Sequence, residues 1–211
     1  MSRRLVVLPA TLAAGAAVTV GAGLAAGALS GSAATPSRTG GLAEPALVHP
    51  FTAYGDRALY DLVPGGSFRA DAARWSLRDG AAVITDATPG LGVGARALAL
   101  TDGASATSAS FPGANVHTVR FYAGNLSGAT STLAVTARLN IDGVVSQVPL
   151  GTITARRLAP SPVIAVPAAV QRELTDSNGR LAVTVTAVGG SGRAVVKDVY
   201  VDPWMRCGND C

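Results

Sequence analysis

Side chains that could act as acids, bases or nucleophiles are few in this 211-residue sequence, and their spacing does not suit catalysis. The histidines, the glutamates and two spaced aspartate pairs are His49, His117, Glu44, Glu173, Asp56 with Asp61, and Asp198 with Asp202. Glycoside hydrolysis needs two carboxylates held across one sugar, but Glu44 lies in a polar segment and Glu173 in a predicted helix. The aspartate pairs are typical of strand ends and turns, and the sequence has no Gly-x-Ser-x-Gly elbow. We therefore expect no catalytic residues and no enzyme activity.

Motifs for cofactors and metals are equally scarce. The segment 90–94 shares only its glycines with a dinucleotide-binding loop, and Lys197, the single lysine, follows no glycine-rich phosphate loop. Cys207 and Cys211 form a Cys-Gly-Asn-Asp-Cys segment, in which two thiolates leave zinc short of four ligands. The sequence predicts no cofactor, no metal and, in an oxidising compartment, a local disulfide between these cysteines.

Charge argues against nucleic acid as a partner. The net charge is +4, and the 17 basic residues are arginines apart from Lys197. The arginines are scattered singly, except for Arg156 and Arg157, whereas a phosphate-tracking surface needs basic residues clustered on one face. The composition, 48% hydrophobic and 14% charged, fits one compact domain with additional chain length.

The N-terminal 34 residues have the pattern of an export signal. Arg3 and Arg4 precede an uncharged apolar run over 5–29, and the small residues of 30–34 suit cleavage after Ala33 or Ala34. We expect a signal peptide over 1–34 and a secreted or cell-envelope protein, exported by either the Sec or the twin-arginine route. The alternative is an uncleaved membrane anchor, since about 25 apolar residues can span a bilayer. The membrane is a partner only in that case.

The rest of the chain divides into three parts. Residues 35–55 have no apolar period and are predicted to be a flexible linker. Residues 56–204 carry the alternating segments of a β-sandwich domain, and 205–211 form a tail with the local disulfide.

Period-2 alternation predicts several strands. In 133–141 the odd positions are apolar and the even ones mostly polar, and Asp142-Gly143 then suits a type I′ turn that returns the chain over 144–148. Residues 181–188 alternate in the same way, break at the glycines of 189–192 and lead into 194–201, which predicts a second hairpin. Val119, Phe121 and Ala123 share one side of another strand with His117, which we expect to be a core or strand-end histidine.

Weaker strands are predicted over 58–62, 82–85, 97–101 and 105–110, and a helix over 168–174. About eight strands in some 150 residues cannot bury both faces as one flat sheet. The sequence therefore predicts an all-β fold, an antiparallel jelly-roll β-sandwich.

Four short segments carry a resemblance. Gly65-Gly66-Ser67-Phe68, Trp75-Ser76-Leu77, 80–83 and 197–203 are similar to an uncharacterised family of secreted proteins from high-GC Gram-positive bacteria. That family in turn resembles the galactose-binding-like jelly roll of carbohydrate-binding modules. Over about residues 51–204 the resemblance implies a jelly-roll sandwich, a non-catalytic role and, in some members, a structural calcium between the first and last segments.

The calcium positions depart from the family's pattern. Arg69 stands where the family usually has Glu, and Lys197-Asp198 stands where it usually has two aspartates. A hard cation needs clustered carboxylate and carbonyl oxygens and would be repelled by a guanidinium. We therefore expect no metal, and expect instead that Arg69 pairs with Asp198 across the two segments.

A candidate ligand surface follows if strands 116–124 and 133–141 pair as neighbours. Sugar-binding modules combine an aromatic ring with polar groups that reach the sugar hydroxyls. The outward residues would then share one face: Arg120, Tyr122, Thr136, Arg138 and Asn140. Two arginines in this set favour an acidic or phosphorylated glycan, although such residues are also ordinary on a solvated sheet face. Trp75 and Trp204 are expected to pack at the sandwich edges.

Two functions remain open. The first is a secreted, non-catalytic binding module for extracellular material such as a cell-wall glycan or a surface protein. The second is a structural or anchoring protein of the cell envelope with no small ligand.

Overall fold

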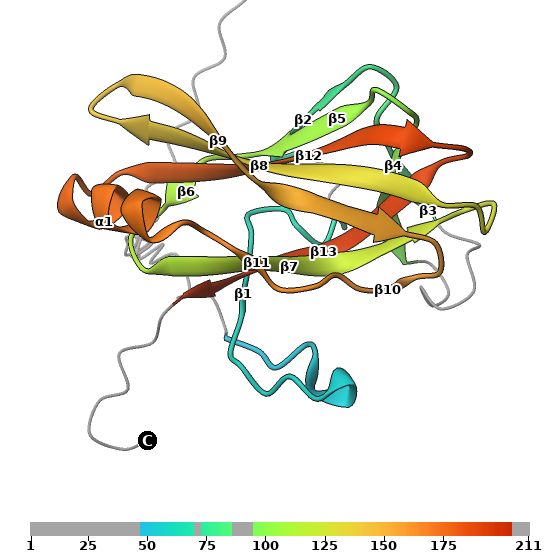
Figure 1. The fold of residues 1–211 in the computed structure, drawn as a ribbon, viewed down its shortest axis with the longest axis horizontal. Helices are drawn as coiled ribbons and strands as arrows, with labels where there is room; N and C mark the ends of the chain where they lie inside the picture. The colour runs from blue at the N-terminus through green and yellow to red at the C-terminus, as the bar shows by residue number, and fades with distance from the viewer. Residues whose placement is uncertain (1–46, 70–72, 86–94, 204–211) are drawn as a thin grey trace, which may run out of the picture. The chain divides into compact units, whose positions relative to one another are not determined.

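Two antiparallel sheets pack face to face in the computed structural model, which describes residues 47–69, 73–85 and 95–203 (Figure 1). The first sheet has seven strands in the order β10-β7-β13-β4-β3, with β1 beside β13 and β11 beside β7. Their bounds are β1 Asp61–Leu62, β3 Ala82–Thr85, β4 Arg96–Leu100, β7 Val116–Asn125, β10 Ala159–Pro160, β11 Ile164–Ala165 and β13 Ala194–Pro203. The predicted all-β antiparallel sandwich is thereby confirmed.

The second sheet has six strands in the order β2-β5-β12-β8-β9, with β6 beside β12. Their bounds are β2 Trp75–Arg78, β5 Ser105–Ser108, β6 Phe111–Pro112, β8 Ser131–Ile141, β9 Val144–Ala155 and β12 Arg180–Gly190. The single α-helix in the described part of the chain, α1 (Ala168–Asp176), buries Val170 and Leu174 and confirms the predicted helix.

The core lies between the two sheets and follows from the alternation in the sequence. Leu133 and Val135 of β8 point inward, and Val119 and Phe121 of β7 point toward them from the other sheet, all at most 1% exposed. Burying such side chains supplies the main driving force for this architecture.

The turn at Asp142-Gly143 forms as predicted. Its two residues have φ of 50° and 84°, the left-handed values that a type I′ hairpin requires, and Ile141 pairs with Val144. The returning strand β9 continues to Ala155, beyond the predicted end at Val148, after an irregularity in its pairing with β8.

The second predicted hairpin is wrong. β12 pairs with β8 and β5, whereas β13 pairs with β7 and β4 in the opposite sheet, so the glycine segment between them carries the chain from one sheet to the other. The physical reason is that alternation and a glycine break indicate two strands but do not say which strand lies beside which. β13 pairs with β7 and β4 and is covered on both faces there, so that Val195 and Val196 are both buried.

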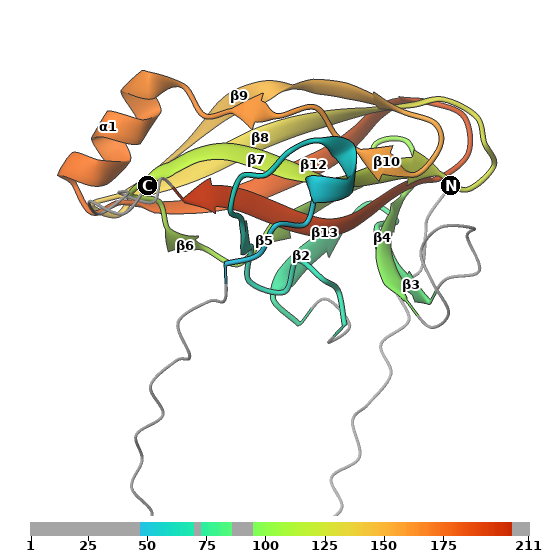
Figure 2. The same cartoon turned by 90° about the horizontal axis from the view of Figure 1, so that it is seen from below.

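Residues 47–60, here called the N-terminal strap, pack on the outer side of the seven-stranded sheet (Figure 2). The strap contains a short 3-10 helix, η1 (Thr52–Tyr54). Phe51, the residue before this helix, has no exposed surface. The described fold thus includes residues that lie inside the range 35–55 predicted as a linker. Within that range Phe51 is the fully buried hydrophobic residue among those described, and one such residue produces no periodic pattern from which an ordered segment could be predicted.

Some predictions fall outside the described residues: the signal peptide over 1–34, the glycine segment 90–94, Trp204 and the disulfide between Cys207 and Cys211. Among the residues that are described, no helix has the length and apolarity needed to cross a bilayer. Trp75 packs inward from β2, an edge strand, with its ring centroid 5.1 Å from that of Phe68.

Candidate functional site

Phe51 anchors the N-terminal strap to the sheet. Its ring lies edge-on to Tyr60 and Tyr200, with centroid separations of 5.0 and 5.6 Å, and tilted against Tyr122 at 5.2 Å. The guanidinium of Arg120 sits 4.4 Å from the centroid of the Phe51 ring, a cation–π arrangement. A single side chain of the strap therefore makes contact with two strands, β7 and β13.

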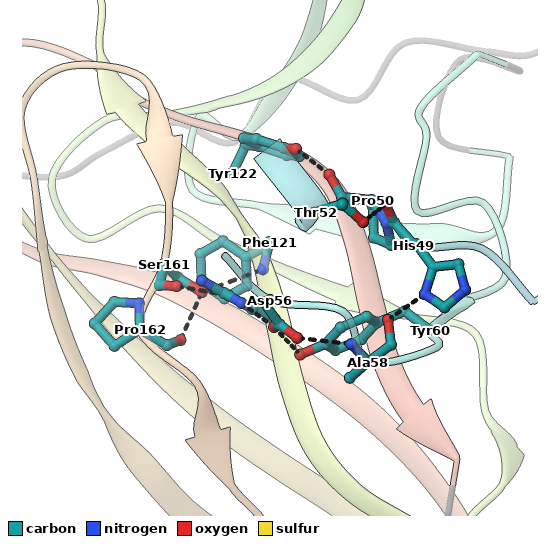
Figure 3. A network of polar contacts seen from close by, with 11 residues as sticks. His49, Pro50, Thr52, Asp56, Ala58, Tyr60, Phe121, Tyr122, Ser161 and Pro162 are labelled. Atoms are coloured by element: carbon teal, nitrogen blue, oxygen red, sulfur yellow. Dashed lines mark hydrogen bonds and ion pairs between the residues drawn. The ribbon is translucent and has the colours of Figure 1, made fainter. Parts of the chain in front are cut away.

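An ion pair between Arg120 and Asp56 is the second attachment of the strap to the sheet. Figure 3 shows Asp56 beside Tyr60 and Ala58 of the strap. Arg120 Nε also donates to the Ser161 carbonyl oxygen at 3.0 Å, while Asp56 accepts from the Tyr60 hydroxyl at 2.7 Å and from the Ala58 amide at 2.9 Å. Because the two charged side chains are only 12% and 19% exposed, the pair is shielded from water and holds the strap firmly. Arg120 is therefore a structural residue of the strap.

Further hydrogen bonds close the strap into a loop. Val48 and Tyr60 exchange backbone hydrogen bonds of 2.9 and 2.8 Å, and His49 Nδ1 donates to the Ala58 carbonyl oxygen at 3.2 Å. The Tyr122 hydroxyl of β7 donates to the Pro50 carbonyl oxygen at 2.8 Å. His49 thus has a structural partner, and the strap is tied both to itself and to the sheet.

The environment of Asp56 makes this attachment sensitive to acid. Burial by itself would raise the pKa of Asp56, but the hydrogen bonds from Tyr60 and Ala58 and the charge of Arg120 together lower it below the usual value of 3.8. A carboxyl whose pKa is depressed in the folded state adds stability above its unfolded pKa. That stability is lost as the pH falls through the lower, folded value.

We expect the strap to loosen selectively below about pH 4, where unfolded aspartates begin to protonate. The measurement is the rate of proteolytic cleavage within 47–60, followed from pH 6 down to pH 3 with an acid-tolerant protease. Asp56→Asn should show faster cleavage already at pH 6 and a flatter pH dependence than the wild type. Asp61, Asp198 and Asp202 have raised pKa values, so their protonation at low pH favours the folded state and cannot cause the loosening. Equal pH profiles for wild type and Asp56→Asn would therefore contradict the role of Asp56 as the acid-sensitive group.

A pocket of about 380 Å³ opens between the strap and the sheet. The strap, β7, the segment after β9 and β13 each contribute to its lining: Pro50, Tyr54, Tyr122, Leu158, Lys197, Asp198 and Tyr200. Tyr54 is the most accessible wall, 58% exposed, and its ring centroid lies 6.2 Å from that of Tyr122. We call this the strap pocket.

A β-bulge in β13 places two charged side chains at the pocket. The pairing of β13 with β7 shifts between Lys197 and Tyr200, and Asp198 has a φ of 48°, a left-handed value that Asp tolerates better than most residues. Lys197 Nζ lies 3.4 Å from Asp198 Oδ2. Val199 turns into the core instead, where its carbonyl oxygen accepts from the Val63 amide at 2.9 Å.

Burial keeps the hydroxyls of two pocket tyrosines, Tyr122 and Tyr200, protonated at neutral pH. Burial, reinforced by the negative charge of Asp198, raises the pKa of Tyr200 to about 12, and burial also raises that of Tyr122. The Tyr122 hydroxyl is used by Pro50, whereas those of Tyr54 and Tyr200 have no hydrogen-bond partner among the described residues. Two hydroxyls are thus left to donate or accept at the pocket.

Burial also raises the pKa of Asp198, while the charges of Lys197 and Arg69 act in the opposite direction. The lining of the pocket therefore offers aromatic rings, an ammonium donor and a carboxylate acceptor. Its volume lies at the lower end of the range of roughly 300–1,000 Å³ found for small-molecule sites. This combination suits a small polar ligand that has an apolar face.

The five residues predicted as one ligand surface do not lie together. Arg120 and Tyr122 belong to β7 in the seven-stranded sheet, and Thr136, Arg138 and Asn140 belong to β8 in the six-stranded sheet. β7 pairs with β13, β10 and β11, whereas β8 pairs with β12 and β9, so the condition that the two strands are neighbours is not met. Of the five, Tyr122 lines the strap pocket.

The predicted pair between Arg69 and Asp198 is also corrected. Within the described part of the chain, the ion-pair partner of Asp198 is its neighbour Lys197, and Arg69 acts on it only through its charge. The β-bulge explains the difference, because it turns two adjacent side chains of β13 toward each other.

The implied calcium site does not fit these residues. The Asp198 carboxylate is already matched by an ammonium, and Arg69 adds positive charge near it. Among the residues that the structure describes, no three His, Cys, Asp or Glu side chains gather as metal ligands would.

Sequence reasoning missed Tyr54, Lys197 and Tyr200 as site residues. Tyr54 falls in the segment predicted as a linker, and nothing in the sequence around Lys197 indicates a binding site. Tyr200 gave a usable signal, because it alternates with the buried Val199 and Val201 and must therefore point outward as Tyr122 does.

Comparison with known proteins finds no matching family model and no matching curated protein. Several solved structures are similar in fold. The tandem of family 22 carbohydrate-binding modules from Paenibacillus barcinonensis Xyn10C aligns with a TM-score of 0.49 and 11% identity over 72% of this chain, which spans about half of that chain, 47%. The C-terminal family 22 module of Clostridium thermocellum Xyn10B aligns with a TM-score of 0.45 and 15% identity, covering 65% of this chain and 90% of that module. A family 11 module from Clostridium thermocellum, in complex with a mixed-linked tetrasaccharide, aligns with a TM-score of 0.42 and 12% identity, covering 64% of this chain and 91% of that module.

These likenesses concern the β-sandwich alone, since all three identities are at most 15% and all three TM-scores are below 0.5. The expected similarity to carbohydrate-binding-module sandwiches is present at that coarse level. The bacterial family suggested by the short segments stays a prediction, as does any ligand.

Proposed function

We propose that this protein is a non-catalytic binding module for a carbohydrate and that the strap pocket is its binding site. The observation that carries the proposal is the convergence of Tyr54, Tyr122 and Tyr200 with the Lys197–Asp198 pair around about 380 Å³. The proposal keeps the class of function predicted from the sequence and moves the site to different residues.

The chemistry of a sugar supports this assignment. A pyranose ring has an apolar face of C–H groups that packs on an aromatic ring, and a rim of hydroxyls that both donate and accept hydrogen bonds. Tyr54 offers an accessible ring, Lys197 offers donors, and Asp198 offers acceptors. The apolar face and the hydroxyl rim of a sugar would therefore each meet a suitable group.

The lining favours binding over hydrolysis. Glycosidases hold two carboxyl groups roughly 5–9.5 Å apart across the scissile bond. The residues that line the strap pocket include one carboxylate, Asp198, which is paired with Lys197. A lone carboxylate can orient a hydroxyl but cannot supply both halves of the reaction.

The place of action is proposed from the sequence. The export pattern over 1–34 would deliver the module to the cell envelope or the medium, where a cell-wall or environmental glycan is the partner in question. A structural or anchoring role without a small ligand is the alternative that a failure to bind any glycan would favour.

The test is binding of the purified protein to a panel of neutral, acidic and phosphorylated glycans, with Tyr54→Ala as the variant. Loss of one aromatic stacking contact, worth about 0.5–1.5 kcal/mol, should weaken binding by roughly 2- to 12-fold. Because the Tyr54 side chain is exposed, the thermal stability of the Tyr54→Ala protein should match that of the wild type.

Arg138→Ala is the matched control, since Arg138 is an exposed residue on the other sheet. It should bind the same glycans with unchanged affinity. No binding to any glycan, or a loss of binding in Arg138→Ala but not in Tyr54→Ala, would refute the strap pocket as a carbohydrate site.

A further inference from the structure

Lys197 and Asp198 present a donor and an acceptor side by side at one wall of the strap pocket. Their charged atoms are 3.4 Å apart, and their side chains are 23% and 22% exposed. Two hydroxyls on neighbouring carbons of a sugar ring have a similar spacing, so one can accept from the ammonium while the other donates to the carboxylate. Charged partners make such hydrogen bonds stronger and more directional than neutral ones.

The size of the pocket limits how much of a glycan it can hold. A volume of 380 Å³ corresponds to roughly a dozen water molecules at about 30 Å³ each. The roughly one dozen non-hydrogen atoms of a hexose are bonded to one another and fill about half the volume of as many waters, so the pocket has room for about one or two sugar rings. Pro50 and Tyr54 of the strap line it together with Leu158, and this limited space favours the end of a glycan over a long segment laid across a sheet.

The charges of the pocket favour a neutral sugar. Among the lining residues, the ammonium of Lys197 and the carboxylate of Asp198 offset each other, and burial raises the pKa of Tyr122 and Tyr200. The two arginines that suggested an acidic glycan are not available there, because Arg120 pairs with Asp56 and Arg138 is on the other sheet. Arg69 acts on Asp198 and Tyr200 through its charge but is not a lining residue, so an acidic sugar would meet no unmatched cation in the lining of the strap pocket.

We propose that the strap pocket recognises the terminal residue of a neutral glycan through a free vicinal diol held by Lys197 and Asp198. This inference rests on the proposed carbohydrate-binding function and adds the ligand class. Tyr54 packs on the ring of the terminal sugar, and the rest of the glycan extends into solvent. Affinity then depends on the end of the chain and hardly on its length.

The single lysine provides a direct probe of this contact. Reductive methylation with ¹³C-formaldehyde keeps the charge of Lys197 and one of its N–H donors. It yields one dimethyl-lysine NMR signal, distinct from that of the dimethylated N-terminal amine, because the chain has no other lysine. Titration with methyl glycosides of neutral hexoses and pentoses should shift that signal. Titration with the same glycoside carrying an O-methyl group on either hydroxyl of the diol should require at least tenfold more ligand.

Affinities of the unmodified protein complete the test. From disaccharide to hexasaccharide of one neutral series, affinity should change less than about threefold. Lys197→Met and Asp198→Asn should each weaken binding at least tenfold, and Asn suits the left-handed backbone at 198, so the bulge should persist. Arg138→Met is the matched control and should bind as the wild type does.

The outcomes separate this inference from the proposed function. Affinity that rises steadily up to the hexasaccharide, preference for uronic acids, or full binding by Lys197→Met would overturn terminal diol recognition while leaving a carbohydrate module in place. Absence of binding to any glycan, with the dimethyl-lysine signal unmoved throughout, would remove both.

Discussion

Phe51→Ala should release the N-terminal strap and abolish ligand binding at the strap pocket. The Phe51 ring is fully buried among aromatic rings of the strap and of β7 and β13. Truncating a buried Phe costs about 3–5 kcal/mol, and here the loss falls on the most deeply buried side chain of the strap. For a domain of this size we expect a decrease in Tm of roughly 6–20 °C.

The effect on binding follows from the position of the anchor. Pro50 and Tyr54, on either side of Phe51 in the strap, form one wall of the pocket. Without the anchor, this wall is lost even where the sandwich still folds. Calorimetry or thermal denaturation measures the first effect, and glycan titration and proteolysis of 47–60 measure the second.

Two variants serve as controls for Phe51→Ala. Phe51→Leu keeps much of the buried volume and should lose clearly less stability than the alanine variant. Tyr54→Ala changes the same segment at an exposed position and should leave Tm unchanged while weakening binding. A Phe51→Ala protein with the Tm and the binding of the wild type would show that the strap is not held in this way.

The second large effect is expected at the crossing between the sheets. Gly190 ends β12 with a φ of 111°, and a Cβ atom there would clash with the backbone of Thr130 and Ser131. Backbone strain and steric overlap each cost about 1–3 kcal/mol. Gly190→Ala should therefore lower the free energy of unfolding by about 3 kcal/mol, measured by urea denaturation.

Gly128→Ala separates strain from overlap. Gly128 also has a left-handed φ, 71°, but no atom lies within 4 Å of the Cβ that alanine would add. It should lose only the conformational cost, about 1 kcal/mol. Equal losses in the two variants would mean that the close approach of β12 to Thr130 does not constrain the crossing.

The strap pocket joins residues that are far apart in the sequence. Its aromatic walls come from position 54 in the strap, 122 in β7 and 200 in β13, and its charged pair from a bulge in β13. Three different structural features hold these walls in place: the buried Phe51, the ion pair between Arg120 and Asp56, and the irregular pairing of β13. Function in this protein would thus reside in features added to the outside of the sandwich.

The sequence by itself determined where most of the longer strands lie and which of their faces are buried, although the short strands β6, β10 and β11 gave no signal. Val119, Phe121, Leu133 and Val135 point inward as the alternation predicts, and Asp142-Gly143 turns the chain as its residue types require. Both signals are local, because the direction of a side chain along a strand and the φ of a turn depend on a few neighbouring residues.

Only the tertiary structure decided which strands are neighbours and which outward residues meet. β12 and β13 are consecutive but lie in opposite sheets, and the same is true of the strands that carry Tyr122 and Arg138. Alternation is blind to this choice, because an apolar face is equally well buried whichever strand lies beside it. The partner is selected by packing and loop closure over the whole chain, and the strap pocket exists only once that selection has been made.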